Sequence, residues 1–288
     1  MDRGLPLVEA QVSEYQYYEF QAIDRSLTSR EMADLRKLST RAEITPTSFV
    51  NVYNWGNFRG NPAHLMEKYF DAFLYASNFG GRELMLRLAR RHVDLRTASR
   101  YSCAPSATLK AKGRFVVLGF QDSGESDDGD EWESGEGRLA SLLQLREAVL
   151  DGDRTLFYLG WLLGVQQGDV EEDAAEPPVP TGLTRLSAPH KAFVDFFRID
   201  RDLLSAAAKA SPARDARAKL RPKVGAAVRG LKPAEKDKLL VRLLEGNAGQ
   251  VRSELAMRVG RGRSKDESPR PFKGGRTAGD LLDAAGIR

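Results

Sequence analysis

The sequence holds few of the residues that build most catalytic and metal centres. Its 288 residues include one cysteine, Cys103, and three histidines, His64, His92 and His190. One cysteine cannot form an internal disulfide, and the chain lacks CxxC, HExxH, GxSxG and GxxxxGK[ST] patterns. These gaps argue against a metal site built from histidine and cysteine, and against a bound cofactor. We expect no catalytic residues, and the gaps favour a protein that is not an enzyme without excluding one.

Long apolar runs are also missing. The longest candidate, residues 155–165 (TLFYLGWLLGV), has about half of the roughly 20 residues that a bilayer requires, and charged residues flank it. It is expected to form a buried helix. The N-terminal residues lack a basic region followed by an apolar run, which is the pattern of a secretory signal. We therefore expect a cytoplasmic protein without a membrane partner.

Charge is distributed unevenly along the chain. Residues 203–288 hold 20 lysines and arginines against 9 aspartates and glutamates, whereas residues 1–202 hold 24 against 31. The C-terminal part is therefore basic and the N-terminal part acidic. The acidic charge is densest at residues 122–137, where eight of sixteen residues are acidic and none is basic. That composition predicts a mobile surface loop.

The N-terminal part combines strand and helix patterns. Alternating aromatic residues predict a strand at 15–23, and Thr28 with Glu31 forms a capping-box pattern for a helix ending near Ser39. Asn61 and Pro62 predict a second helix, which carries apolar residues as far as 76 and ends at glycines 80 and 81. Residues 82–90 read as a strand and 107–122 as a hairpin turning at 112–113.

The fold class depends on residues 43–54. Because Pro46 cannot donate to a sheet ladder, these residues form either one edge strand or a hairpin. The hairpin gives the order βαββαβ and an α+β, ferredoxin-like (split βαβ) sheet domain, which we prefer. The single strand gives βαβαβ and favours a parallel sheet.

Two parts are predicted from this pattern. An α+β domain spans 1–167, includes the acidic loop 122–137, and ends with helices at about 138–150 and 154–167. An acidic, proline-bearing linker spans 168–186. An all-helical, basic region spans 187–288, with a flexible tether at 260–276 and helix starts near residues 187, 200, 233, 247 and 277.

Two surfaces are candidates for binding. The stretch ITPTSFVNVYNWGNFRGNP (44–62) is read mainly as sheet and turn structure, but Trp55, Phe58 and Arg59 offer a stacking face with a charge. The second candidate is the basic C-terminal part, whose charge density suits phosphate contacts. Its residues are Lys209, Arg214, Arg217, Lys219, Arg221 and Lys223.

The isolated chemical groups have simpler interpretations. His64, in the first turn of its helix, is expected to be a polar surface group. Cys103 is expected to be a small buried apolar residue, although Arg100 nearby would favour a thiolate. The acidic loop lacks EF-hand spacing, because Gly129 comes too early, and is expected to be solvated.

The chain resembles a conserved bacterial protein family in several segments. The N-terminal ones are YYEFQAIDRSLTSREMADLRKLSTRAEITPTSFVNVYNWGNFRGNP and LMEKYFDAFLYASNFGGRELMLRLARR; the C-terminal ones are LSAPHKAFVDFFRIDRDLLSAAA and RTAGDLLDAA. The resemblance covers most of the chain. It implies no activity, cofactor or catalytic residue, because none is established for that family.

These observations lead to one main expectation and one alternative. The main expectation is a non-enzymatic interaction or adaptor protein, whose basic helical module binds an acidic partner, another protein or a nucleic acid. The alternative is an enzyme that acts on nucleic acid or nucleotides with a divalent metal ion held by the acidic loop.

Overall fold

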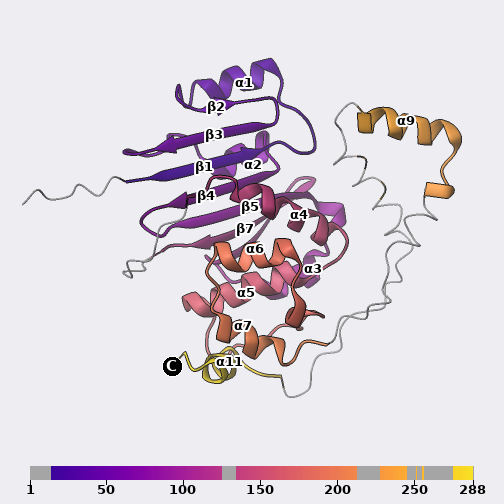
Figure 1. The fold of residues 1–288 in the computed structure, drawn as a ribbon. Coiled ribbons are helices and arrows are strands. Elements are labelled where there is room, and N and C mark those ends of the chain that lie inside the picture. Colours follow the sequence, from indigo (N-terminus) through magenta and orange to yellow (C-terminus); the bar gives the residue numbers. More distant parts are fainter. Residues whose placement is uncertain are drawn as a thin grey trace, which may run out of the picture.

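One antiparallel sheet forms the centre of the molecule. The computed structural model describes residues 14–124, 134–212, 228–244, 251, 255 and 275–287 (Figure 1). Within these ranges seven strands lie in the order β2-β3-β1-β4-β5-β7-β6. Their bounds are β1 Gln16–Gln21, β2 Glu43–Ile44, β3 Ser48–Tyr53, β4 Ala72–Ser77, β5 Arg82–Ala89, β6 Ala107–Lys112 and β7 Phe115–Asp122.

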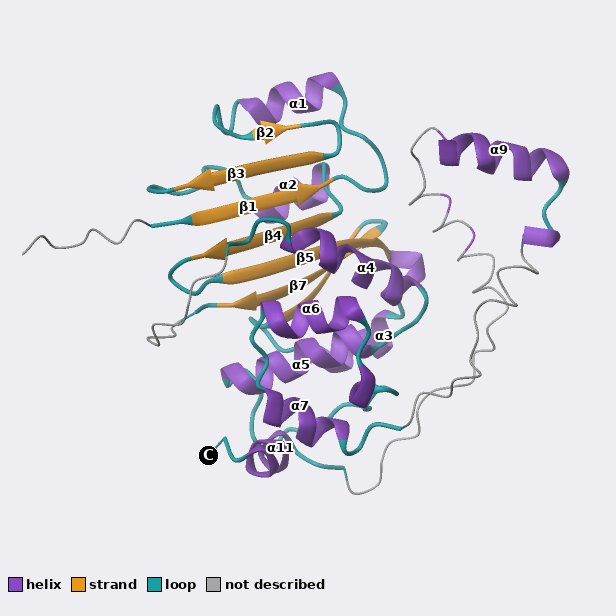
Figure 2. Ribbon diagram, viewed as in Figure 1, coloured by secondary structure: helices purple, strands orange, loops and turns teal. Residues whose placement is uncertain are grey.

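Helices lie on both sides of this sheet, and the two layers share β4 but are otherwise centred over different strands. On one side α1 (Ser29–Arg36) and α2 (Pro62–Lys68) pack on β1, β3 and β4 around Phe20, Phe49 and Phe73. On the other side, α4 (Arg138–Leu150), α5 (Thr155–Gln167) and α6 (Ala188–Phe196) pack on the apolar side chains of β4, β5 and β7. Figure 2 shows α4 in front of the strands and α2 behind them. The two helical layers are therefore offset.

Several predicted helix starts are confirmed. Thr28 and Glu31 form the expected capping box, and the Asn61 side chain accepts a hydrogen bond from the His64 N–H, 3.0 Å away. The Asp200 side chain caps α7 (Arg201–Ala208), and Thr277 with Asp280 caps α11 (Ala278–Ala285). Each cap satisfies backbone N–H groups that the first helical turn leaves without a partner.

The predicted helix from Pro62 to Gly80 is wrong. The helix ends at Lys68, and residues 72–77 form β4, a strand in the middle of the sheet. Residues Tyr69 to Leu74 are buried without a break, so their apolar pattern fits a strand covered on both faces as well as a helix. Gly80 has a φ of +92°, which places it in the tight turn to β5.

The mixed class of the prediction is confirmed in its coarser form. The N-terminal region holds an antiparallel sheet and the later residues are mainly helical, but a ferredoxin-like fold is not confirmed. Residues 43–53 form the predicted hairpin, β2 and β3, and 107–122 form the predicted hairpin β6 and β7. Every strand pair in the sheet is antiparallel, so the parallel βαβαβ alternative is wrong.

The predicted linker, residues 168–186, contacts the rest of the molecule. The Tyr101 hydroxyl donates to the Pro178 carbonyl at 2.7 Å, and Glu176 accepts a hydrogen bond from Tyr158. One hydrophobic cluster also extends across this segment, with Phe120 of β7 and Phe193 of α6 in edge-to-face contact at 5.0 Å. Independent folding of the two parts stays a prediction.

The C-terminal residues return to the main body. Arg276 donates to Glu176 at 2.9 and 3.0 Å and to the Ala206 carbonyl of α7 at 2.7 Å, and α11 buries Leu281. Arg276 is thus docked, so the tether predicted for 260–276 ends before it. Residues 260–274 lie outside the described residues. The helix expected from Asn247 does too, apart from Val251 and Leu255.

Smaller elements complete the described chain. They are the 3-10 turns Arg90–His92, Ser99–Tyr101 and Leu183–Arg185, the short helix α3 (Leu95–Ala98), and α9 (Pro233–Leu244). In α9, Leu239 packs against Leu231 and Val251. No described helix combines the length and the apolar character that crossing a bilayer requires.

A buried ion pair joins the ends of three strands. Asp71, at the start of β4, is fully buried, and Arg87 of β5 is only 5% exposed. Asp71 Oδ1 accepts from Arg87 Nε at 3.1 Å and from Nη2 at 2.7 Å, while its Oδ2 accepts from the N–H groups of Ile23 and Asp24, just beyond β1. The carboxylate therefore has four donors, as a buried charge requires.

The same arginine holds helices from both layers. Its Nη1 donates to the Met66 and Glu67 carbonyls in the last turn of α2, at 2.9 and 3.0 Å. From the opposite layer, Arg146 of α4 donates to the Arg87 carbonyl at 2.9 Å and to Asp24 at 2.6 Å. Arg87 thus connects the sheet to α2 on one side and to α4 on the other.

Replacing Asp71 with asparagine is expected to destabilise the protein by about 3–5 kcal/mol, because Arg87 then keeps its charge in a buried site without a carboxylate. Chemical denaturation of the full chain measures the change. Asp34→Asn is the control: Asp34 pairs with Lys37 at an exposed position, so its unfolding midpoint should not move. Equal midpoints for the wild type and Asp71→Asn would contradict the assigned role.

Candidate anion-binding surface

The offset of the helices leaves part of the sheet accessible on the α1/α2 side. There β5, β7 and β6 carry side chains in paired rows: Arg87 lies opposite Val117, which lies opposite Lys110, and Ala89, Phe115 and Lys112 form the next row. Phe115 and Val117 are half-buried, and both lysines are exposed. We call the surface formed by Glu83, Arg87, Lys110, Lys112, Phe115, Val117 and Gln121 the open sheet face.

Exposed cations lie on the open sheet face and at one end of it. Lys110, Lys112 and Arg114 come from the β6–β7 hairpin, and Arg90 and Arg91 follow β5; all five are exposed. The Arg90 N–H donates to the Arg114 carbonyl at 2.8 Å, so the two segments meet at this end of the sheet. Exposed cations of this kind attract anions over about 8 Å at physiological ionic strength.

This cationic region was not identified from the sequence, although a local count indicates it. Residues 82–114 contain nine lysines and arginines against two acidic residues, Glu83 and Asp94. The negative total for residues 1–202 conceals the excess. Only the sheet pairing shows that these residues come together, because they belong to two strand ends and a hairpin turn.

Phe115 gives the surface a fixed aromatic group. The Arg87 guanidinium carbon lies 4.6 Å from the centre of its ring, and that of Arg114 lies 4.9 Å away. Arg87 cannot move freely, because Asp71 and two α2 carbonyls hold it. The ring therefore rests on a rigid, buried cation, and its position is set before any partner binds.

Glu83 brings a carboxyl group to this face. Burial raises the pKa of the Glu83 carboxyl to about 7, and the nearby Lys110 ammonium opposes this shift only in part. Glu83 lies opposite Tyr75 of β4 and Gln121 of β7. The group therefore changes charge near neutral pH, which alters the net charge of the open sheet face.

The residues predicted at the β3–α2 connection have different surroundings. Phe58 packs into the aromatic cluster, with its ring centre 5.1 Å from that of Tyr18 and 5.8 Å from that of Phe49. Trp55 is 68% exposed, with the Arg41 guanidinium 5.8 Å from its ring, and Arg59 is exposed. Phe58 thus packs, partly buried, against the aromatic cluster, and binding by Trp55, Phe58 and Arg59 stays a prediction.

Most of the predicted C-terminal cations lie outside the described residues. These are Arg214, Arg217, Lys219, Arg221 and Lys223; Lys209, at the end of α7, is described and exposed. Residues 125–133 of the acidic loop are also outside the described chain. Among the residues that are described, no group of three or more His, Cys, Asp or Glu side chains could hold a metal ion.

Two further sequence candidates have ordinary surroundings. His64 is exposed, as expected for a polar surface group. Burial raises the pKa of the Cys103 thiol to about 11, with the Asp169 carboxylate as a second cause, so the thiol is protonated at neutral pH. A protonated thiol is a poor nucleophile, which agrees with the structural interpretation of Cys103.

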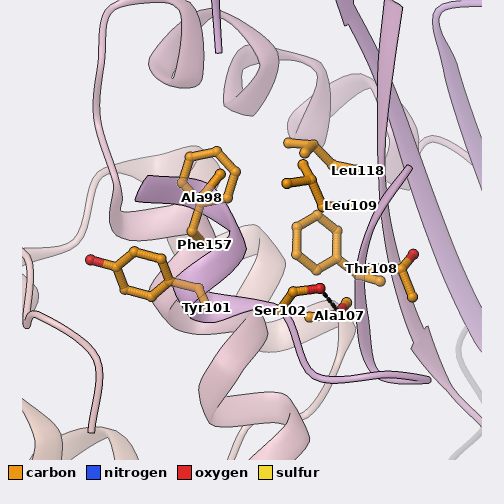
Figure 3. A pocket seen from close by; sticks show the side chains of 9 residues that line it. Ala98, Tyr101, Ser102, Ala107, Thr108, Leu109, Leu118 and Phe157 are labelled. Atoms are coloured by element: carbon orange, nitrogen blue, oxygen red, sulfur yellow. Dashed lines mark hydrogen bonds between the residues drawn. The ribbon is translucent and has the colours of Figure 1, made fainter. Parts of the chain in front are cut away.

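A small cavity lies on the other side of the sheet (Figure 3). Its volume is about 10 Å³, room for about one water molecule, and Tyr101, Leu109, Leu118 and Phe157 are among its lining residues. The Ser102 hydroxyl beside it donates to the Ala107 carbonyl at 3.0 Å. The cavity is too small for a ligand.

No family model, no curated protein and no solved structure matches this chain. The interpretation of the open sheet face therefore depends on its own geometry and charge.

Glu83→Gln is expected to remove part of the pH dependence of stability. The folded pKa of about 7 lies above the ordinary value of 4.5, so the wild type binds more protons when folded and loses stability as pH rises between these values. The loss is at most about 3 kcal/mol. Glutamine does not titrate, so this variant keeps its stability through that range.

Thermal melts at pH 5 and pH 8 measure the difference between the two proteins. Glu171→Gln, which changes an exposed carboxylate, serves as the control and should follow the wild type. An unchanged pH dependence in Glu83→Gln would show that Glu83 titrates as an ordinary exposed carboxylate.

Proposed function

We propose that this protein is an interaction protein that binds an acidic partner, and that single-stranded nucleic acid is the partner its described surface suits best. The observation that carries the proposal is the open sheet face, where exposed cations lie near an aromatic ring on a rigid support. Such a surface combines phosphate attraction with a ring against which a base can stack.

The spacing of the cations favours an extended, flexible partner. The rows that hold Lys110 and Lys112 lie two residues apart on one side of β6, and Phe115 lies opposite Lys112. A single strand can follow such a row with its phosphates beside the lysines and a base against the ring. A double helix keeps its bases stacked inside, where a ring on the sheet does not reach them.

The basic C-terminal part adds to this attraction in the proposal. Residues 203–288 carry an excess of eleven positive charges, 20 against 9. Lys209 directly follows α7, and Arg276 donates to the Ala206 carbonyl of the same helix. Lys209 and the basic residues that follow it therefore start from a fixed point on the main body, and they supply sequence-independent phosphate contacts.

The alternative function, an enzyme with a divalent metal ion in the acidic loop, has no specific observation in its favour. Residues 125–133 of that loop lie outside the described residues, and the remainder of the described chain offers no cluster of ligands. An assay for cleavage of an oligonucleotide or a nucleotide, with and without a divalent ion, would detect it.

The wild-type protein is expected to bind a single-stranded oligonucleotide with strong salt dependence. If about four phosphates are neutralised, affinity falls roughly 50-fold between 50 and 200 mM salt. Lys110→Glu with Arg114→Glu is expected to weaken binding at least tenfold at 50 mM salt and to flatten the salt dependence. Fluorescence anisotropy with a labelled oligonucleotide measures both quantities.

The control is Lys191→Glu with Arg201→Glu. It makes the same change of charge at exposed positions on α6 and α7, away from the open sheet face. If the two double variants lose equal affinity, binding follows total charge and not this surface. If neither the wild type nor the control binds at 50 mM salt, the proposed function is wrong.

A further inference from the structure

A cavity of about 290 Å³ opens beside the open sheet face, between α2 and the β6–β7 hairpin. This volume is close to the lower end of the range for small-molecule sites, about 300–1,000 Å³. The cavity is lined by His64, Glu67, Lys68, Arg87, Lys112, Phe115 and Val117.

The floor of the cavity is apolar and fixed in place. Phe115 and Val117, both half-buried, come from β7, and Arg87 beneath them is held by the Asp71 carboxylate. Arg87 uses most of its N–H groups on Asp71 and on two α2 carbonyls. Arg87 therefore shapes the floor, and other groups must supply the cation for a bound anion.

Lys112 and Lys68 supply that cation at the edge of the cavity. Lys112 forms an ion pair with Glu67 of α2, and the Lys112 side chain is 71% exposed. Lys68 lies over the Tyr69 ring, with its nitrogen 4.8 Å from the ring centre. Pairs as exposed as Lys112 and Glu67 contribute little to stability, so an incoming anion can replace Glu67 at Lys112 at little cost.

The lining selects the chemical class of the ligand. An apolar floor with a compact ammonium at its edge suits a molecule that has a flat apolar body and one anionic group. Lysine is a common point-charge partner for phosphate. A nucleotide meets both conditions, and the neighbouring open sheet face would bring a strand to the same place.

We propose that this cavity is a binding site for one nucleotide unit, with its base against Phe115 and Val117 and its phosphate at Lys112 in place of Glu67. The assignment rests on the proposed function, because it names the part of a strand that the cavity takes. It also makes a separate claim, since a mononucleotide alone should bind.

Calorimetry with adenosine 5′-monophosphate, adenosine and inorganic phosphate tests the assignment on the full chain. The monophosphate is expected to bind at least tenfold more tightly than either of the others, because only it uses both the floor and Lys112. Lys112→Met should weaken its binding at least tenfold. Glu67→Gln should tighten binding about threefold or more, because the competing carboxylate is gone.

Lys191→Met is the matched control. Lys191 is an exposed lysine on α6, away from the open sheet face, and it does not line the cavity. Its affinity for the monophosphate should stay within twofold of the wild type. Melting temperatures of all three variants confirm folding, since the changed side chains are at least partly exposed.

The outcomes separate this assignment from the proposed function. If the oligonucleotide binds but the monophosphate binds neither the wild type nor Glu67→Gln, the cavity assignment is wrong and the proposed function stands. Equal losses in Lys191→Met and Lys112→Met also overturn it. If the monophosphate binds as expected and the oligonucleotide does not, the cavity is a nucleotide site and the proposed function is wrong.

Discussion

The buried ion pair between Asp71 and Arg87 joins the sheet to helices on both of its sides. A carboxylate and a guanidinium removed from water must be fully paired, because an unpaired buried charge costs several kcal/mol. Asp71 meets this condition with donors from Arg87 and from the chain that leaves β1. Arg87 meets it with Asp71 and the carbonyls that end α2. Both charges are fully paired only when the end of β1, the start of β4, β5 and the end of α2 lie together as they do here.

The pair also connects the fold to the proposed binding surface. Arg87 donates to carbonyls in the last turn of α2 and so holds this helix over β1, β3 and β4. The strands β7 and β6 stay accessible on that side of the sheet. The same guanidinium supports the Phe115 ring from below. The open sheet face and the cavity beside it therefore have a rigid base, and their lysines are exposed. The groups that can reach a partner's charge are thus on the surface, whereas the groups beneath them are buried and paired.

Local signals in the sequence predicted much of the fold. Capping residues such as Thr28, Asn61 and Thr277 mark helix starts by side-chain chemistry that acts within three residues, so neighbours along the chain suffice to detect them. β4 was missed because a strand buried on both faces shows no alternation, and its apolar residues also fit a helix. The open sheet face was missed for another reason. Arg87, Lys110 and Phe115 meet only through strand pairing, which a count of charges along the chain does not reveal.

The proposed function requires that an anionic strand binds at the open sheet face. Hydrogen exchange of backbone amides, measured by mass spectrometry on the full chain with and without a saturating single-stranded oligonucleotide, locates this contact. We expect slower exchange in residues 107–122 and 62–68, the hairpin and helix that border the face, with α6 and α7 unchanged. Protection confined to residues 203–288, or no protection in the hairpin, would contradict it.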